Sequence, residues 1–215
     1  MYAILFLMSF ISSITPNLEI EKKYWRQGIE FVAGVDEVGR GCLAGPVVVA
    51  AVIFSPDHIQ SLEIKDSKLL SPAKRDKLFD FIYQNALDIS VSLMTVDIID
   101  QVNILEATKL AMIQAIETTS AEQALIDGRD VPDSQCSCQA IIKGDQKSYS
   151  IAAASIIAKV VRDALMTQLD YDFPNYDWAH NKGYGTKRHR QAILDHGPTV
   201  HHRAKFIRKI LGHST

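Results

Sequence analysis

Four acidic residues stand where short apolar runs end, each of them close to a glycine. They are Asp36, Glu37, Asp127 and Asp145. The ends of strands are where sites form in an open α/β sheet. Clustered carboxylates repel one another and raise each other's pKa, so such a cluster is stable only when a cation compensates. Mg²⁺ and Mn²⁺ prefer oxygen ligands, and the absence of His and Cys from these runs disfavours zinc. We therefore expect a divalent-metal site suited to phosphodiester chemistry.

One geometric difficulty concerns Asp36 and Glu37, because neighbouring residues on a strand point to opposite faces. The two acids can share a site only if the pleat breaks there, and Gly39 and Gly41 favour such a break. The alternative is that one of them is a surface residue. Taken singly, each acid is more often a solvated or turn-forming residue, since Asp-Gly is itself a common turn signal. The sequence does not by itself show that the four converge.

Apolar periodicity and turn signals predict that strands and helices alternate along the chain. The expected strands are 31–36, 47–54, 89–96, 124–127 and 140–143, and the expected helices are 71–86, 104–117, 150–169 and one or two more from 186 onward. This order is typical of an α/β or α+β layer fold with a mixed sheet.

Composition and charge narrow the class of protein. The 215 residues are 47% apolar, which fits one folded domain with or without an appendage. Three cysteines without framework spacing indicate reduced thiols rather than a secreted disulfide scaffold. The net charge of −2 hides an asymmetry, because residues 179–215 contain eight Lys or Arg and a single Asp. This basic segment suggests phosphate contacts beside the acidic site, although a solvated basic helix would look the same.

The N-terminal residues 2–14 are mostly apolar, but the run is shorter than the roughly 20 residues that span a bilayer. It also lacks the basic start of a secretory signal. We expect residues 1–28 to be a dispensable extension, with Met8 as a possible true start, and we expect no membrane association.

An ordered set of motifs between Phe31 and Phe206 resembles ribonuclease HII, a family of the ribonuclease H-like superfamily. The motifs are GVDEVGRG at 34–41, LAGPVVVAA at 43–51, DSKL at 66–69, LIDG at 125–128, KGD at 143–145, SIAAASIIAK at 150–159 followed by Arg162 and Asp163, and GYGT at 183–186. Each motif alone is weak, but their common order is specific. The arginine between the two glycines at 39 and 41 resembles type HII, since the sister type HIII usually has lysine there.

The resemblance implies a ribonuclease H-like α/β fold, a mixed sheet flanked by helices with a helical C-terminal extension. It implies a catalytic core over 29–178 and a basic segment over 179–215 that completes the substrate cleft. It also implies that the four acids are catalytic and bind the metal. The substrate contacts that it implies are Gly39, Arg40 and Gly41 at the ribose 2′-hydroxyl, Tyr184 on a neighbouring nucleotide and Lys68 near the substrate backbone. Lys205 stands where the family often has serine, so a contact from that position is in doubt.

The implied activity is that of a metal-dependent endonuclease acting with Mn²⁺ or Mg²⁺. Such an enzyme cuts the RNA strand of RNA–DNA hybrids, and it cuts duplex DNA on the 5′ side of embedded ribonucleotides, leaving a 3′-hydroxyl and a 5′-phosphate. We expect a cytoplasmic monomer. Two alternatives stay open: another nuclease of the same fold, such as an integrase-like protein acting on all-DNA substrates, and a non-catalytic hybrid-binding module. The role of Asp163 is also open, either beside the metal or paired with a neighbouring Arg or Lys.

Overall fold

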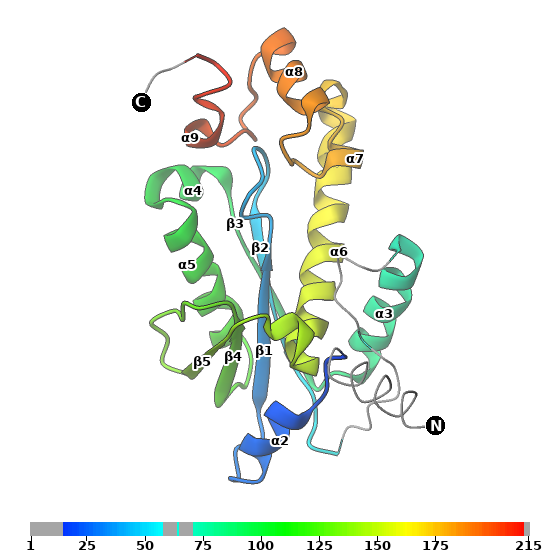
Figure 1. The fold of residues 1–215 in the computed structure, drawn as a ribbon, viewed down its shortest axis with the longest axis vertical. Helices are drawn as coiled ribbons and strands as arrows, with labels where there is room; N and C mark the ends of the chain where they lie inside the picture. Colours follow the sequence, from blue (N-terminus) through cyan, green and yellow to red (C-terminus); the bar gives the residue numbers. More distant parts are fainter. Residues whose placement is uncertain (1–14, 58–63, 65–70, 213–215) are drawn as a thin grey trace, which may run out of the picture.

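The computed structural model describes residues 15–57, 64 and 71–212, and within them it shows a five-stranded mixed sheet with helices on both faces (Figure 1). The strand order is β3-β2-β1-β4-β5. β1 pairs antiparallel with β2, and β2 with β3, whereas β1, β4 and β5 run parallel. The expected fold class, a ribonuclease H-like mixed sheet flanked by helices, is confirmed.

The elements follow the chain in a simple order. The strands are β1 (Val32–Val38), β2 (Val47–Ile53), β3 (Asp88–Met94), β4 (Gln123–Asp127) and β5 (Ser137–Ile141). The α-helices are α2 (Glu19–Trp25), α3 (Pro72–Asn85), α4 (Val96–Val102), α5 (Ile104–Glu117), α6 (Tyr149–Asp172), α7 (Trp178–Asn181), α8 (Lys187–His196) and α9 (Ala204–Ile207), with short 3₁₀ turns at η2 (Gly144–Gln146) and η3 (Pro174–Tyr176).

Each face of the sheet is covered by one long helix. Every residue of β2 is buried, as expected of a central, β-branched strand with helices on both sides. α5 packs on one face with α4 beside it, and α6 packs on the other with α3 (Figure 1). Gly34 lets α6 approach β1 closely, because a Cβ at this position would lie 2.1 Å from the Ser150 carbonyl carbon. The N-terminal part of α6 therefore lies directly on the strand that carries Asp36 and Glu37.

Several sequence predictions need correction. β5 spans Ser137–Ile141 rather than 140–143, because its pairing with β4 starts three residues earlier than its apolar residues suggest. The short helices α2 and α4 were not predicted. On the edge strand β3, the apolar side chains of Val91 and Leu93 are 39% and 42% exposed. Ser90 and Ser92, which alternate with them, are buried. The Ser92 hydroxyl donates to the Gln114 side chain at 2.8 Å, which satisfies that buried polar group.

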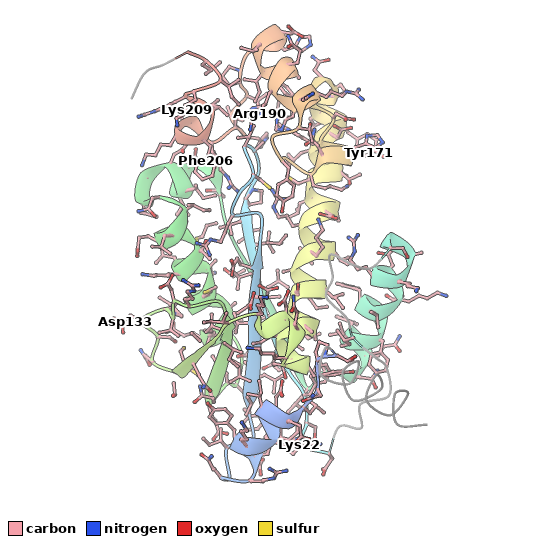
Figure 2. The ribbon with its side chains drawn as sticks, viewed as in Figure 1. Lys22, Asp133, Tyr171, Arg190, Phe206 and Lys209 are labelled. Atoms are coloured by element: carbon pink, nitrogen blue, oxygen red, sulfur yellow. The ribbon has the colours of Figure 1, made fainter. Side chains whose placement is uncertain are left out.

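The C-terminal helices and the end of α6 enclose a third apolar cluster, centred on the fully buried Trp178. Leu43 and Ala44 join this cluster from the loop between β1 and β2. Figure 2 shows Arg190, Phe206 and Lys209 at this end of the molecule, opposite Lys22 of α2. None of the helices in the described part of the chain is long and apolar enough to cross a membrane.

A pair of histidines lies at the centre of this third cluster. Trp178 Nε1 donates to His189 Nε2 at 3.0 Å, and His202 Nε2 lies 3.1 Å from the same His189 atom. The His189 nitrogen thus accepts both bonds, which requires His189 to be neutral and His202 to donate through Nε2. His202 is neutral as well, because its other ring nitrogen is an acceptor. His202 Nδ1 then accepts from the Thr199 amide at 2.9 Å. Burial, with His189 and His201 nearby, lowers the pKa of His202 from 6.5 to about 4.

We predict that acid weakens the fold through this pair. The folded protein binds a proton at His202 more weakly than the unfolded chain does. The stabilisation that neutral His202 contributes is therefore present above about pH 6.5 and is lost as the pH falls toward 4. Between pH 7 and pH 4.5 the free energy of unfolding should fall by roughly 2 to 3 kcal/mol more in the wild type than in His202→Gln. Urea unfolding at the two pH values measures the difference, and the exposed His180→Gln is the matched control. Equal pH dependence in His202→Gln and wild type would contradict the prediction.

α2 lies within the expected extension 1–28, and its Glu21 side chain is fully buried. Glu21 Oε1 accepts from the Ser148 hydroxyl at 2.6 Å and from the amide and hydroxyl of Ser150 at 3.0 and 2.8 Å. These donors belong to the first turn of α6, whose amides have no partner within the helix. Burial raises the pKa of Glu21, in opposition to these hydrogen bonds. Residues 15–28 thus tie α2 to the helix that carries part of the candidate site, and whether residues 1–28 can be removed stays a prediction.

Replacing Glu21 should separate the stabilisation by its hydrogen bonds from the cost of burying its carboxyl group. We expect Glu21→Ala to lower the free energy of unfolding by about 1–3 kcal/mol, because it leaves buried serine donors without an acceptor. Glu21→Gln keeps a carbonyl acceptor and should cost less. Urea unfolding measures both, with Glu19→Ala on the exposed side of the same helix as control. A Glu21→Ala variant as stable as Glu19→Ala would show that the tie is dispensable.

Candidate active site

A pocket of about 360 Å³ opens between the end of β1 and the middle of α6. Its lining combines acids, cations and an aromatic ring: Asp36, Glu37, Val38, Arg75, Ser155, Lys159 and Tyr184. The structure therefore brings two of the predicted acids together with the predicted substrate-contacting tyrosine. These residues come from parts of the chain almost 150 positions apart.

Asp36 lies at the bottom of this arrangement, with 5% of its surface exposed. Its Oδ1 accepts from the Glu37 amide at 2.7 Å, and the Ser155 hydroxyl of α6 also donates to it. Burial raises the pKa of Asp36 well above its usual range, and the charges of Glu37 and Asp127 raise it further. Three of the four predicted acids are thus close enough to interact electrostatically.

Asp36 and Glu37 share the pocket without the expected break in the pleat. β1 continues regularly through both residues to Val38, with Asp36 opposite Ala50 and Glu37 opposite Val49. The pairing of β1 with β4 ends at Val35, so beyond it β1 has only β2 as a strand neighbour. Because one side of the strand is open there, the longer Glu37 side chain reaches the same pocket. Its Oε1 forms an ion pair with Arg40 at 3.2 Å.

Asp127 and Asp145 come from β4 and from the η2 turn that follows β5. Asp127 is the last residue of β4, and its Oδ1 accepts from the Gly144 amide at 2.6 Å. This bond fixes the η2 turn, in which Asp145 is 4% exposed. The side chain of Asp127 therefore positions the backbone that carries Asp145. The lining of the pocket includes neither residue.

The acids are not arranged as a finished metal cage. Among the residues that the structure describes, no group of three Asp, Glu, His or Cys side chains is placed to hold a metal ion. The chemistry of the donors nevertheless fits a hard cation, because Asp36, Glu37 and Asp127 offer carboxylate oxygens and destabilise each other's charge. The assignment of these four acids to metal binding stays a prediction.

Of the predicted substrate contacts, Tyr184 lines the pocket, whereas Gly39, Arg40 and Gly41 follow the end of β1 without lining it. Tyr184 is 42% exposed, and its carbonyl accepts from His189 Nδ1 at 2.9 Å, so the neutral histidine pair also holds the tyrosine loop. Gly39 has a φ of +95°, which a residue with a side chain rarely adopts. Arg40 is exposed and paired with Glu37, and Lys68 lies outside the described residues.

Three polar residues of the pocket lining were not singled out from the sequence: Arg75, Ser155 and Lys159. Lys159 and Arg75 both contact Asp163, at 2.7 and 3.3 Å, so the structure places Asp163 in an ion-pair network. Ser155, Lys159 and Asp163 recur every four residues on α6, and this helical spacing is the signal that would have found them. The network fixes two cationic side chains in the pocket that Asp36 also lines.

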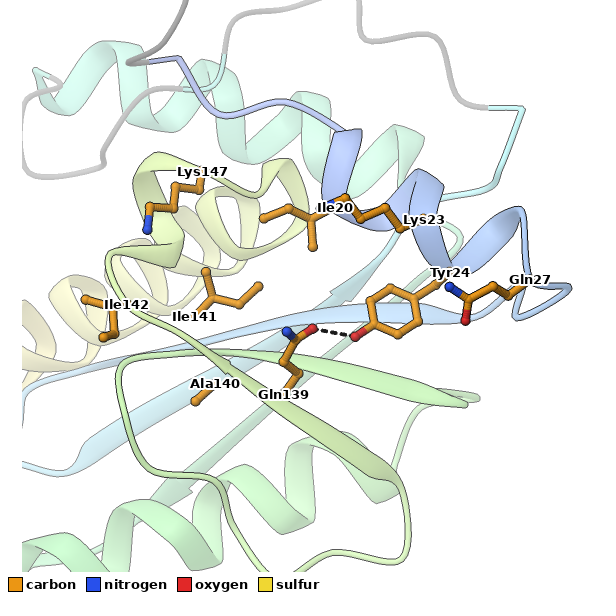
Figure 3. Close-up of a pocket in the computed structure, with 9 residues that line it drawn as sticks. All are labelled: Ile20, Lys23, Tyr24, Gln27, Gln139, Ala140, Ile141, Ile142 and Lys147. Carbon is orange, nitrogen blue, oxygen red and sulfur yellow. Dashed lines mark hydrogen bonds between the residues drawn. The ribbon is translucent and has the colours of Figure 1, made fainter.

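A second pocket, of about 660 Å³, lies between α2 and the edge strand β5 (Figure 3). Its lining includes Lys23, Tyr24, Gln139 and Lys147, and the Tyr24 hydroxyl donates to Gln139 (Figure 3). None of the four acids lines this pocket, despite its larger volume. The chemistry therefore points to the smaller, acid-lined pocket.

Curated relatives match most of the chain. The chain is 45% identical over 203 residues to a ribonuclease HII of Alkaliphilus metalliredigens, which covers 91% of this chain and 98% of the relative. It is 49% identical over 197 residues to a ribonuclease HII of Thermosynechococcus vestitus, which covers 91% and 92%. At such identities over such coverage, the chain and these relatives share one family.

Solved structures of ribonucleases HII and H2 have the same fold as this chain. A ribonuclease HII of Archaeoglobus fulgidus, determined in a complex with PCNA, superposes with a TM-score of 0.72 at 30% identity, over 82% of this chain and 95% of that one. Ribonuclease H2 of Pyrococcus horikoshii gives 0.72 at 28% identity, over 84% and 96%. The ribonuclease HII family model matches residues 33–209, which include all four acids and Tyr184. The chain belongs to the ribonuclease HII family and is an endoribonuclease of the ribonuclease H type.

Proposed function

We propose that this endoribonuclease hydrolyses the RNA strand of RNA–DNA hybrids and cuts duplex DNA on the 5′ side of an embedded ribonucleotide, leaving a 3′-hydroxyl and a 5′-phosphate. One observation carries the proposal. The buried carboxylate of Asp36 shares a pocket with Glu37, with two cationic side chains and with Tyr184, next to the Gly39–Arg40–Gly41 turn. A phosphodiester and its ribose would meet all these groups together.

We further propose that Asp36, Glu37, Asp127 and Asp145 hold Mg²⁺ or Mn²⁺. A bound divalent cation neutralises charge at the acids and the scissile phosphate and activates the attacking water. The clustered like charges and the raised pKa of Asp36 support this assignment, since both penalise the site without a cation. Asp127 has the additional task of holding the Gly144 amide, and hence the turn of Asp145.

The protein's own residues would orient the substrate. Lys159 and Arg75, fixed by Asp163, lie where they can contact a phosphate beside Asp36. The exposed ring of Tyr184 can pack on a sugar or base next to the scissile bond, a contact worth about 1–3 kcal/mol. The 2′-hydroxyl is the group that distinguishes RNA from DNA. The glycine-rich turn at Gly39–Arg40–Gly41 would recognise this group. These contacts also give the basic segment 179–215 a part in the substrate cleft. The monomeric state and the cytoplasmic location stay predictions.

A duplex with one ribonucleotide tests the proposed reaction. We expect cleavage on the 5′ side of that ribonucleotide with Mg²⁺ or Mn²⁺, and none after chelation or on the all-DNA duplex of the same sequence. Denaturing electrophoresis against size standards locates the cut, and end-labelling identifies the termini. Cutting of the all-DNA duplex would favour an integrase-like nuclease, whereas binding without cutting in either metal would favour a hybrid-binding module.

Asp36→Asn tests the acid that is central to the site. Losing a charged ligand should lower kcat by more than about 100-fold. The metal-free protein should keep or gain stability, because a buried negative charge beside Glu37 and Asp127 is removed. The matched control is Asp133→Asn, on the exposed loop between β4 and β5 (Figure 2). Substantial Mg²⁺-dependent cutting by Asp36→Asn would overturn the assignment.

A further inference from the structure

A buried guanidinium group lies directly behind the Gly39–Arg40–Gly41 turn. Arg203 is fully buried, although it belongs to the basic C-terminal segment. Its Nη2 donates to the Gly39 carbonyl at 2.7 Å and its Nη1 to the Arg40 carbonyl at 2.8 Å. Nε and Nη2 both donate to the Gly45 carbonyl, at 3.1 and 2.8 Å. The Phe206 ring lies 5.3 Å from the guanidinium carbon.

The charge of Arg203 is balanced by backbone dipoles. No ion pair of Arg203 occurs within the described ranges, so three carbonyl oxygens and the face of Phe206 replace water around it. Burial lowers the pKa of Arg203 to about 10, which still leaves it protonated at neutral pH. Burying a charge costs free energy unless the charged group is hydrogen-bonded. The guanidinium of Arg203 forms these hydrogen bonds with the turn that the ribose would contact.

Because Arg203 fixes two carbonyl groups of the turn, it also fixes the direction of the amide groups that follow them. In a trans peptide the carbonyl and the following amide N–H point in opposite directions, and the chain has no cis peptide in its described part. Holding the Gly39 carbonyl inward therefore turns the Arg40 amide outward, and holding the Arg40 carbonyl inward turns the Gly41 amide outward. Neither amide has a backbone acceptor within the described part of the chain. Two consecutive outward amides form a concave donor site for an oxygen atom.

We propose that Arg203 is the positioning residue for ribose recognition: it aims the amides of Arg40 and Gly41 at the 2′-hydroxyl side of the substrate. This inference rests on the proposed function and identifies what sets its specificity. Arg203 touches no substrate atom, and it acts through the backbone of the turn.

The same segment couples the turn to Tyr184. The Arg203 amide donates to the Leu43 carbonyl at 2.8 Å, and the Leu43 amide donates to the Gly183 carbonyl at 2.8 Å, one residue before Tyr184. A second buried arginine, Arg162, donates to the carbonyls of Pro46 and Lys182 at 2.9 and 2.8 Å. The ribose-reading turn and the tyrosine loop are thus held as one rigid unit.

The test compares Arg203→Lys with the exposed Arg208→Lys in the same segment. A lysine ammonium is a compact point charge and cannot serve three carbonyls as the planar guanidinium does. Fluorescence anisotropy gives the Kd of a duplex with one ribonucleotide and of the all-DNA duplex, with Ca²⁺ replacing Mg²⁺ under conditions where no cutting is detected. We expect the ratio of the two Kd values to fall about tenfold or more in Arg203→Lys and to stay at the wild-type value in Arg208→Lys. In Mg²⁺, KM for the ribonucleotide duplex should rise more than kcat falls.

A purely structural role would lower thermal stability or weaken both duplexes equally, and would leave the Kd ratio unchanged. If Arg203→Lys does not fold, Phe206→Leu removes the aromatic contact of the guanidinium, keeps an apolar side chain against the third cluster, and should lower the ratio by a smaller factor. A wild-type ratio in the folded variant overturns the proposal. A wild type that neither discriminates between the duplexes nor cuts at the ribonucleotide overturns the proposed function instead, so the two failures are distinct.

Discussion

The burial of Asp36 beside other acids is the constraint on which the site depends. A carboxylate with 5% exposure next to Glu37 and Asp127 is destabilised in its charged form both by lost hydration and by repulsion. The fold tolerates this cost because the carboxylate accepts hydrogen bonds from the Glu37 amide and from Ser155. These bonds fix the direction of the acid, and the proposed cation offsets its charge. Unfavourable electrostatics of this kind are typical of functional sites. The surrounding sheet, in contrast, has an ordinary apolar core.

α6 is the scaffold that makes this arrangement rigid. Its first turn is capped by the buried Glu21, and its backbone touches β1 at Gly34, where a side chain would not fit. One turn after another, it then presents Ser155 to Asp36 and Lys159 to the pocket. Because the helix lies directly on the strand, the acids and the cations keep a fixed separation. The pocket therefore contains opposite charges at fixed positions, and its two cations are held there by Asp163.

The C-terminal segment contributes Tyr184 to the pocket and Arg203 to the turn that follows β1. Its basic composition suggested phosphate contacts, but Arg203 of this segment and Arg162 of α6 have a different role. Both are fully buried and hold backbone carbonyls of two loops, rather than facing solvent. The neutral pair of His189 and His202 adds a further constraint, since it fixes the Tyr184 carbonyl. A segment whose composition suggested a charged surface helix thus contains several buried polar residues, Arg203, His189 and His202, that hold neighbouring loops.

The sequence by itself determined the fold class, through its apolar periodicity and turn signals, and the family, through an ordered set of motifs. It also predicted the four acids, because acids that follow apolar runs beside glycines are a local signal that can be found without coordinates. It did not determine how Asp36 and Glu37 share a pocket, since that depends on where the pairing between β1 and β4 stops. Neither could it show that Asp127 holds the Gly144 amide, that Asp163 pairs with Lys159 and Arg75, or that Arg203 is buried. Each of these facts joins residues that are far apart in the chain or hidden among similar charges. Only tertiary packing, which decides which polar groups lose water and must find partners, could settle them.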